Sequence, residues 1–233
     1  MVGLKLDEVI DGVFLQRVSR FSAYVLVNEK KELSFLPNPG RMQELLRPYA
    51  KILLRKKQAK TRKTAYEIVA AFDDELIVPI DSRTPNLLLK EAFQKGELKE
   101  LREYKLVKTD FKLGESRYDF LLKDDGERCL VEAKSCTLVK NGVALFPDAP
   151  TERGTRHILG LLEAKRMNYS CFIIFIVQHS AALLFSPNYE VDFRFASTLS
   201  VAAREGVNVL AYKLRRPDRS LRLQIDGHIP VQL

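Results

Sequence analysis

The segment SRYDFLLKDDGERCLVEAKSC, residues 116–136, holds two runs of strand-forming residues on either side of Asp125-Gly126. An Asp-Gly pair favours a two-residue type I′ turn between antiparallel strands. With that turn, the register places Asp119 directly opposite Glu132. The apolar residues of the segment then gather on the reverse face: Tyr118, Phe120, Leu122, Cys129, Val131 and Ala133. The segment therefore predicts a β-hairpin with one face in a core and one face that carries charge.

The charged face brings two carboxylates together. Side chains that oppose each other in an antiparallel pair have Cβ atoms about 4.5–5.5 Å apart, so Asp119 and Glu132 repel each other unless something compensates. A hard divalent cation with oxygen ligands would do so. Lys134 points from the same face about 7 Å further along the strand and could hold a water or a phosphate oxygen. The alternative is a solvated lattice of ion pairs, in which Arg117 and Lys134 neutralise the two acids.

From residue 83 onward, the hairpin is embedded in alternating helices and strands. Segment 171–178 is apolar on both faces, which is typical of the buried centre of a sheet. The predicted elements are a helix from Pro85, strands over Leu106–Leu113, Ser116–Lys123 and Arg128–Cys136, a helix over Thr155–Met167, a strand over Cys171–Gln178, a helix over Phe193–Arg204 and a strand over Val207–Tyr212. This order predicts an α/β domain over residues 83–233, with a mixed central sheet flanked by helices.

Residues 1–82 are instead rich in short β-prone stretches. The predicted strands are Gly12–Val18, Phe21–Asn28, Lys31–Pro37, Tyr49–Lys56, Thr64–Phe72 and Leu76–Ile80, with a brief helix over Arg41–Leu46. Three strands, a helix and two strands is the order of an OB barrel, although another small β-barrel or a sandwich stays open. The chain is therefore expected to be an α+β protein of two domains, residues 1–82 and 83–233.

The charge balance points to a polyanionic partner. Lys and Arg number 38 against 30 Asp and Glu, a net charge of +8, and segment 47–63 contains no acid. Such a surface favours nucleic acid, although a merely solvated charge run is the alternative. The expected nucleic-acid-binding residues are Arg17, Arg20, Arg41, Arg55, Lys56, Lys57, Lys60, Arg62 and Lys63 in the barrel, and Arg153 and Arg156 at the start of a helix, where backbone donors favour an anion.

Two further features support this expectation. Phe21 and Tyr24 lie beside cationic residues and could stack on bases, although either ring could equally belong to the core. His157 follows Arg153 and Arg156 and could contact phosphate, but it could also be an ordinary surface histidine of the helix.

Composition excludes several other classes of protein. Hydrophobic residues at 46% and charged residues at 29% fit a globular fold. The longest apolar run, residues 171–177, is far below the roughly 18 residues of a membrane span, and no leader-like segment opens the chain. The three cysteines lack metal-ligand spacing, and their odd number suggests a reducing compartment. A cytoplasmic protein without membrane contact is expected.

Several segments resemble known families. The hairpin with Asp119 and Glu132-Ala133-Lys134 resembles the PD-(D/E)xK nuclease superfamily. A closer resemblance, over nearly the full chain, is to the sugar fermentation stimulation protein family, SfsA. It rests on residues 116–122 (SRYDFLL), 131–135 (VEAKS), 146–154 (FPDAPTERG) and 38–42 (NPGRM). Ala133 stands where that family commonly has Val, and because this position faces the core, we expect no effect on chemistry.

The resemblance implies an N-terminal OB domain, a C-terminal nuclease-like domain, DNA binding and a regulatory link to sugar utilisation. It also implies that the carbonyl of Ala133 adds a metal ligand to Asp119 and Glu132, and that a further acid comes from the first helix. Glu91 and Glu100 are the candidates for that acid. Asp110 is another, because a tight Gly114-Glu115 turn would place it opposite Asp119.

Three functions follow as hypotheses. The first is a DNA-binding protein without strong sequence specificity, with Asp119, Glu132 and Lys134 as catalytic residues and Mg²⁺ or Mn²⁺ to activate the water that hydrolyses a phosphodiester. The second is a DNA-binding transcriptional regulator of sugar utilisation that keeps the nuclease-like fold and cleaves nothing. The third is an RNA-binding OB module with an accessory domain.

Overall fold

The computed structural model describes residues 3–5, 9–56 and 64–233. Its N-terminal part is a β-barrel built from antiparallel neighbours in the order β4-β3-β2-β5-β6, with β7 added beside β6. A short parallel pairing of β4 with β6 closes the barrel, which is the closed five-stranded architecture of an OB domain. The strands are β2 (Val9–Ser19), β3 (Ser22–Val27), β4 (Lys30–Phe35), β5 (Lys51–Lys56), β6 (Tyr66–Asp73) and β7 (Leu76–Pro79).

The helix expected over Arg41–Leu46 does not form. The chain makes turns there, and Met42 adopts a positive φ of 49° that a right-handed helix cannot accommodate. The amide of Met42 donates instead to Asp148 of the C-terminal part, at 2.9 Å. Leu45 and Leu46 are nevertheless buried in the barrel core, so the apolar pattern of the segment reflects packing under a loop.

The C-terminal part is a mixed sheet of seven strands in the order β1-β16-β15-β13-β10-β9-β8. The apolar strand β13 lies at its centre, as its sequence predicts. The strands are β1 (Gly3–Lys5), β8 (Lys105–Leu113), β9 (Ser116–Asp124), β10 (Glu127–Cys136), β13 (Tyr169–Val177), β15 (Asn208–Leu214) and β16 (Arg222–His228). The N-terminal segment β1 thus joins this sheet by pairing with β16, and the barrel begins only at Val9.

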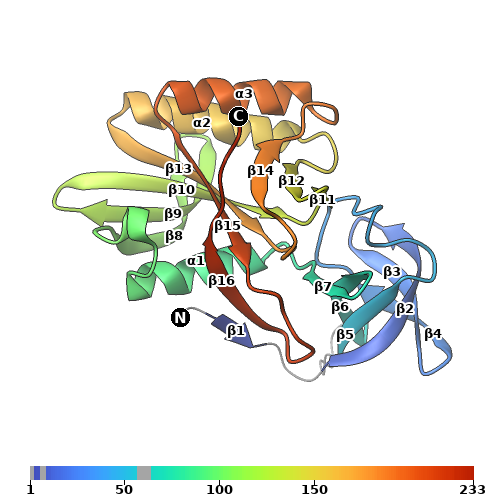
Figure 1. Cartoon of the computed structure of the whole chain (residues 1–233). Coiled ribbons are helices and arrows are strands. Elements are labelled where there is room, and N and C mark those ends of the chain that lie inside the picture. Colours follow the sequence, from blue (N-terminus) through green and yellow to red (C-terminus); the bar gives the residue numbers. More distant parts are fainter. Residues whose placement is uncertain (1–2, 6–8, 57–63) are drawn as a thin grey trace.

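Helices cover both faces of the sheet. Helix α1 (Thr84–Lys95) lies on one face, beside the barrel, and α2 (Glu152–Arg166) and α3 (Phe193–Arg204) cover the other face (Figure 1). Pro85 opens α1, and Gly96, with a φ of 63°, ends it in the left-handed conformation. The remaining elements are a 3₁₀ turn, η1 (Lys99–Leu101), and a small sheet of β11 (Val139–Lys140), β12 (Val143–Phe146) and β14 (Leu184–Pro187).

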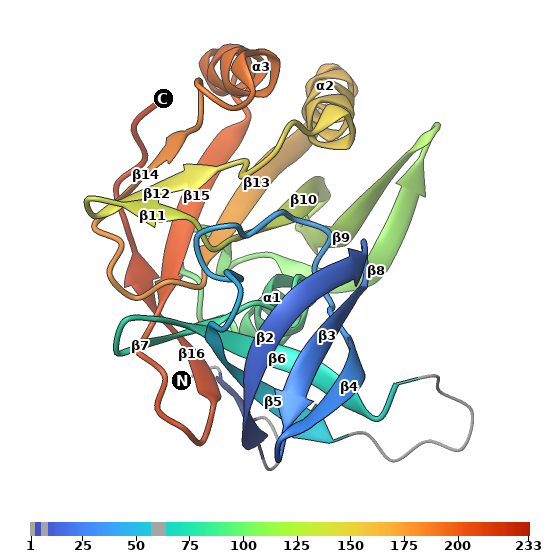
Figure 2. The same ribbon diagram turned by 90° about the vertical axis from the view of Figure 1, so that its right-hand side faces the viewer.

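The barrel packs against α1, and one core cluster runs from the barrel into the C-terminal sheet. Leu53, Val69 and Ile77 of the barrel share this cluster with Leu88 of α1 and Val131 of β10. Figure 2 shows the barrel in front of α1. Asp119 and Glu132 of the hairpin line one cavity with Arg20 and Asn38 of the barrel, so the predicted chemistry lies where the barrel meets the sheet. Within the described residues, no helix has the length and apolar character needed to cross a membrane.

Candidate nuclease-type site

The register of the β9–β10 hairpin agrees with the Asp-Gly turn. Pairing runs from Asp124–Glu127 to Phe120–Val131, and then the ladder stops, one position before Asp119 and Glu132. The backbone amide of Ala133 donates to Asp119 Oδ2 at 2.8 Å instead of to a strand carbonyl. The Asp119 carboxylate thus lies in the gap where the two strands separate.

The predicted alternation of faces is also interrupted at Asp119. Phe120 packs in the core on the α1 side of the sheet, whereas Tyr118 packs in the core on the α2 side. Asp119 and Glu132 are therefore not simple cross-strand neighbours on one flat face. Both nevertheless line one cavity of about 600 Å³.

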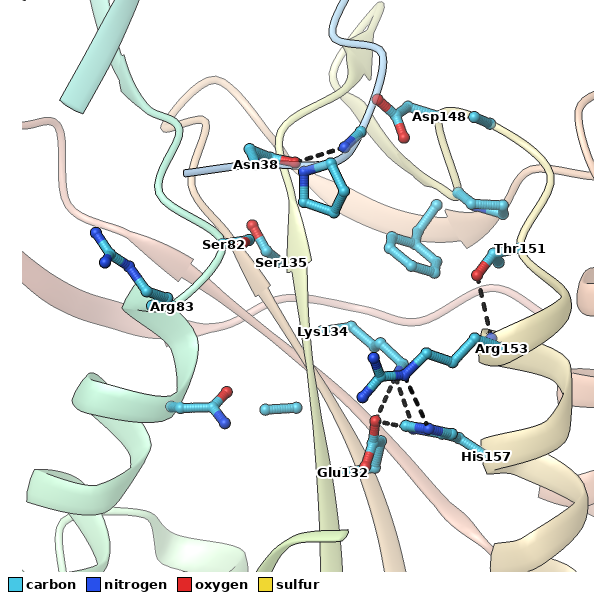
Figure 3. Close-up of a pocket in the computed structure, with 18 of the residues that line it drawn as sticks. Asn38, Ser82, Arg83, Glu132, Lys134, Ser135, Asp148, Thr151, Arg153 and His157 are labelled. Carbon is cyan, nitrogen blue, oxygen red and sulfur yellow. Dashed lines mark hydrogen bonds and ion pairs between the residues drawn. The ribbon is translucent and has the colours of Figure 1, made fainter. Parts of the chain in front are cut away.

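Glu132 is held by two partners. It is 3% exposed, and its Oε1 contacts both the Lys134 Nζ and the His157 Nδ1 (Figure 3). Arg153 Nε donates to His157 Nε2 at 3.3 Å, which leaves Nδ1 as the ring nitrogen that donates to Glu132. Burial by itself would raise the pKa of Glu132, but the Lys134 charge and the His157 contact together lower it. Glu132 is therefore an ionised carboxylate inside a cationic cluster.

Asp119 has different surroundings. Its Oδ1 accepts a hydrogen bond from the Asn86 side-chain amide at 2.5 Å, and its Oδ2 accepts the one from Ala133. Burial, and then repulsion by the charge of Glu132, raise the pKa of Asp119 above its usual range. The two carboxylates therefore repel each other, and the hydrogen bonds to Asp119 compensate its negative charge only in part.

The cavity is built from both parts of the chain. The β2–β3 turn, the loop 38–40 and the start of α1 form one side, and the loop 146–151 and the first turns of α2 form the other. Figure 3 shows Arg83 on the α1 side of Lys134, and Arg153 and His157 on the α2 side. Its cationic lining residues are Arg20, Arg83, Lys134 and Arg153. Asp148 is the third acid of the lining besides Asp119 and Glu132, so the cations outnumber the acids, which suits a ligand with negative charge of its own.

The loop 38–42 is attached to the opposite wall by local geometry. A Cβ at Gly40 would lie 2.8 Å from Asp148 Oδ2, so a larger residue here would have to displace the carboxylate that accepts the Met42 amide. Asn38 is buried, accepts the Gly40 amide through Oδ1 and donates from Nδ2 to the Ile80 carbonyl at 2.7 Å. The segments NPGRM and FPDAP, distant in sequence, therefore meet at the rim of the cavity.

Glu91 and Glu100 do not line the cavity of Asp119 and Glu132, whereas Asp110 lies opposite Asp119 in the β8–β9 register, as predicted, and lines a smaller hollow with it. Glu91 pairs with Lys95 in the next turn of α1, and Asp110 pairs with Arg117 at 2.7 Å on an exposed surface. Glu100 accepts a hydrogen bond from Tyr212 on β15, which two strands separate from β9. Across the part of the chain that the structure describes, no group of three or more His, Cys, Asp or Glu side chains is arranged to hold a metal ion. Of the alternative lattice of ion pairs, Lys134 pairs with Glu132 of its own strand, and Arg117 pairs with Asp110 instead of Asp119 or Glu132.

The expected nucleic-acid-binding residues fall into distinct groups. Arg20 and Arg153 line the cavity, and Arg156 lines an adjoining groove of about 1000 Å³ between α2 and the β8–β9 turn. Arg17 is half-buried and donates to the Asn38 carbonyl, whereas Arg41 and Lys56 are exposed. Lys57, Lys60, Arg62 and Lys63 lie outside the described residues.

Arg55 was expected to contact nucleic acid from the surface, but its side chain turns into the barrel wall. Its side chain is 14% exposed and pairs with the buried Glu67 at 2.7 Å, so it neutralises an acid inside the barrel wall. Arg83, which the sequence did not single out, is the second partner of Glu67 and also lines the cavity. Asn86 was not predicted either. The one feature of the sequence that points to it is its position in the first turn of a helix that Pro85 opens.

The surroundings of Asp119 fit a divalent cation. Two carboxylates in one cavity and the neighbouring carbonyl of Ala133 are hard oxygen donors of the kind that Mg²⁺, Mn²⁺ and Ca²⁺ prefer. The raised pKa of Asp119 indicates negative charge that a cation would relieve. Glu132 would have to shift its contacts with Lys134 and His157, or share its oxygens with them, to serve as a ligand.

Comparisons with known proteins agree with the architecture. The family model described as "SfsA N-terminal OB domain" matches residues 15–80, and that described as "Sugar fermentation stimulation protein RE domain" matches residues 83–219. Sugar fermentation stimulation protein homologs of Clostridium botulinum and Clostridium perfringens are 38% and 39% identical, over 92% and 94% of this chain and 94% and 96% of theirs. A solved structure, "The structure of Pyrococcus Furiosus SfsA in complex with Ca2+", matches with a TM-score of 0.93 at 29% identity, over 100% of both chains. The chain belongs to the sugar fermentation stimulation protein (SfsA) family.

Proposed function

We propose that this protein binds DNA and hydrolyses its phosphodiester bonds at the site of Asp119, Glu132 and Lys134, with Mg²⁺ or Mn²⁺ as cofactor. The observation that supports this most directly is that two acids and a lysine from one hairpin line a single cavity whose other charged residues are largely cationic. A DNA backbone is a polyanion that such a lining attracts irrespective of sequence.

Each residue has a role in this proposal. Asp119, Glu132 and the carbonyl of Ala133 would hold the cation, which when bound lowers the pKa of water and neutralises charge on the phosphate. Lys134 provides a positive charge beside Glu132, where it can stabilise the extra negative charge of the transition state. His157 is a positioning residue, because it orients Glu132 through Nδ1 and is itself held by Arg153. The similar structure from Pyrococcus furiosus was solved in complex with Ca²⁺, which supports the binding of a hard cation in this family.

The path of the DNA follows from the two adjoining hollows. Arg153 and His157 line both the cavity and the groove along α2, which also presents Lys112, Arg117 and Arg156. A backbone that enters the cavity can therefore continue along this groove over cationic side chains. Such contacts read phosphates and not bases, which agrees with weak sequence specificity.

A second function is favoured by a specific observation. The charge of Glu132 is already balanced by Lys134, and His157 donates a hydrogen bond to it, so the cluster needs no cation for charge balance. A DNA-binding regulator that cleaves nothing could keep this cluster for structure alone. The names of the relatives, which refer to stimulation of sugar fermentation, would fit a regulator of sugar utilisation.

Cleavage assays separate the two functions. Wild-type protein, Asp119→Ala and Lys134→Ala would be incubated with single-stranded, duplex and plasmid DNA in Mg²⁺, Mn²⁺ or a chelator. The exposed residues Glu103 and Lys123 provide the matched controls Glu103→Ala and Lys123→Ala. The nuclease proposal expects cation-dependent cleavage by the wild type and both controls only. DNA binding without cleavage of any substrate would favour the regulator.

A further inference from the structure

A row of stacked cations and aromatic rings lies on the barrel side of the cavity. The Arg20 guanidinium lies over the Phe21 ring, 5.5 Å from its centroid, and the Phe21 and Phe35 rings stack at 6.4 Å with an interplanar angle of 27°. The Arg83 guanidinium lies 5.8 Å from the centroid of Phe35. Arg20 and Arg83, the two ends of this row, both line the cavity that holds Asp119 and Glu132.

The row is fixed at its inner end. Arg83 donates to Asp81 and to Glu67, whose side chain is 1% exposed, so its guanidinium is anchored by buried or half-buried acids. Phe35 ends β4, and the backbone of Phe21 accepts a hydrogen bond from the Leu36 amide at 3.0 Å. The Phe21 ring therefore has a defined position relative to the cavity.

The outer end of the row is open. The Phe21 side chain is 44% exposed at the β2–β3 turn, and the Arg20 residue that covers it is exposed, without an acid partner among the ion pairs of the described residues. A single exposed phenylalanine would mean little by itself. Here the exposed ring lies between an exposed arginine, for which the described part of the chain shows no acid partner, and an anchored stack that leads to the cavity.

We propose that Phe21 is a stacking platform for an unpaired DNA base, so that the site takes single-stranded or frayed DNA in preference to an intact duplex. This inference rests on the proposed function, because it assumes that the DNA backbone enters the cavity. A base takes the place on Phe21 that the Arg20 guanidinium occupies in the structure, and Arg20 turns to the adjacent phosphate. Arg83 and Phe35 support the ring from the other side.

The physical basis of the preference is the availability of base faces. Stacking on an aromatic ring accepts any base, because every base has a π-face. Within a duplex both faces of each base are covered by its neighbours, so a base reaches Phe21 only where the strand is unpaired. The cationic lining then holds the phosphates on either side, as in a groove that follows a single strand.

Binding without metal tests this inference independently of cleavage. Anisotropy titrations in a chelator would compare a labelled single strand, its duplex and a single-stranded RNA of the same sequence, using wild type, Phe21→Ala and Phe21→Tyr. Phe193→Ala is the matched control, because Phe193 is a 71% exposed phenylalanine on α3, outside the cavity. Thermal unfolding would confirm that each variant is folded.

The expected result is specific. Phe21→Ala weakens single-stranded DNA binding about tenfold and leaves duplex binding within twofold, whereas Phe21→Tyr and Phe193→Ala bind as the wild type does. An equal loss for single strand and duplex, no loss at all, or a loss confined to RNA would overturn the inference while leaving the proposed nuclease untouched. Failure of the wild type to bind any DNA would overturn both, and absence of cleavage with intact Phe21-dependent binding would affect the nuclease proposal alone.

Discussion

The side-chain amide of Asn86 lies 2.5 Å from Asp119 Oδ1, so the first turn of α1 reaches the carboxylate in the gap of the β9–β10 hairpin. This is where a further acid from the first helix was expected. The helix instead supplies a neutral hydrogen-bond donor, which stabilises the charge on Asp119 without adding a second negative charge. The third carboxylate that the family resemblance implies is therefore not supplied by the first turn of this helix.

Asn86→Asp should make the stability of the protein depend on a cation bound at this site. A third carboxylate next to Asp119 adds like-charge repulsion, so the metal-free protein should lose about 1–2 kcal/mol at pH 7, or a few °C in Tm. Added Ca²⁺ or Mn²⁺ should then raise Tm more than in the wild type, because three carboxylates bind a hard cation better than two. Thermal unfolding with a chelator and with each cation measures both effects.

Asn86→Ser is the control for this experiment, since it removes the amide without adding charge. It should lose only the stability that the hydrogen bond to Asp119 provides, without the larger response to cations. Equal cation-induced shifts in the wild type and Asn86→Asp would contradict the placement of the cation beside Asp119.

Much of the fold was predictable because its signals are local. Asp125-Gly126 fixes the hairpin register through a two-residue turn, and the doubly apolar β13 can only be the centre of a sheet. The OB barrel and the mixed C-terminal sheet flanked by helices are confirmed. The site follows in part, since Glu132 and Lys134 lie on one strand and point the same way.

The remaining features depend on contacts between distant segments. Met42 gives its amide to Asp148, 106 residues away, and so a segment with helical spacing becomes a loop. Asn86 reaches Asp119 only because α1 packs under the sheet, and the register arithmetic could not foresee that the ladder stops before Asp119. Likewise, no local pattern shows that β1 crosses from the barrel to pair with β16.

His157→Ala should weaken the site by releasing Glu132. His157 Nδ1 contacts Glu132 Oε1 and Nε2 accepts from Arg153, so its loss frees two side chains at once. Removal of a residue that orients a metal ligand typically costs 10–100-fold in metal affinity or activity. We expect a loss of this size in Mn²⁺ affinity, measured by calorimetry, and in cleavage rate. His228→Ala, on β16, is the matched control, and an equal effect of the two variants would argue against a positioning role.

The ion pair of Glu67 with Arg55 and Arg83 should make stability depend on pH. Burial by itself would raise the pKa of Glu67, but hydrogen bonds and charge from the two arginines lower it. A lowered folded-state pKa means that the stabilisation is present above the unfolded-state pKa, about 4.3 for a glutamate, and is lost as pH falls through the folded-state value.

Glu67→Gln should therefore cost about 2–3 kcal/mol at pH 7, because Arg55 is left buried beside a neutral group. The difference from the wild type should shrink as the pH falls below about 4. Urea unfolding at pH 7, 5 and 3.5 measures it, with the exposed Glu103→Gln as control. A difference that stays constant over this range would show that Glu67 is not stabilised as an anion.

Basic residues should set the salt dependence of DNA binding. Each phosphate neutralised contributes about 0.7–0.9 to the slope of log K against log salt. Arg20→Gln and Arg153→Gln should each lower the slope by about that amount, as should each single replacement of Lys56, Lys57, Lys60 or Lys63 by Gln. Arg55→Gln should leave the slope unchanged, since Arg55 is paired with Glu67 inside the barrel wall. A slope that falls with Arg55→Gln and not with Arg153→Gln would place the DNA on a different face.

Gly160 allows α2 to approach the strand that carries Asp119. A Cβ at this position would lie 2.6 Å from Tyr118 Oη and 2.8 Å from Ser116 Oγ, so Gly160→Ala must push the helix and β9 apart or move both side chains. Overpacking of this kind typically costs about 1–3 kcal/mol. Because His157 lies one turn earlier on the same helix, its contact with Glu132 should loosen as well. We therefore expect lower stability in urea together with weaker Mn²⁺ affinity.

A second substitution distinguishes this steric effect from a change in helix propensity. Tyr118→Phe removes the hydroxyl that the new methyl group would meet, so the double variant should recover part of the stability that Gly160→Ala loses. Gly227→Ala is the control, because a Cβ there has no neighbour within 4 Å among the described residues. If Gly160→Ala were as harmless as Gly227→Ala, the close approach of α2 to β9 would not be what holds His157 against Glu132.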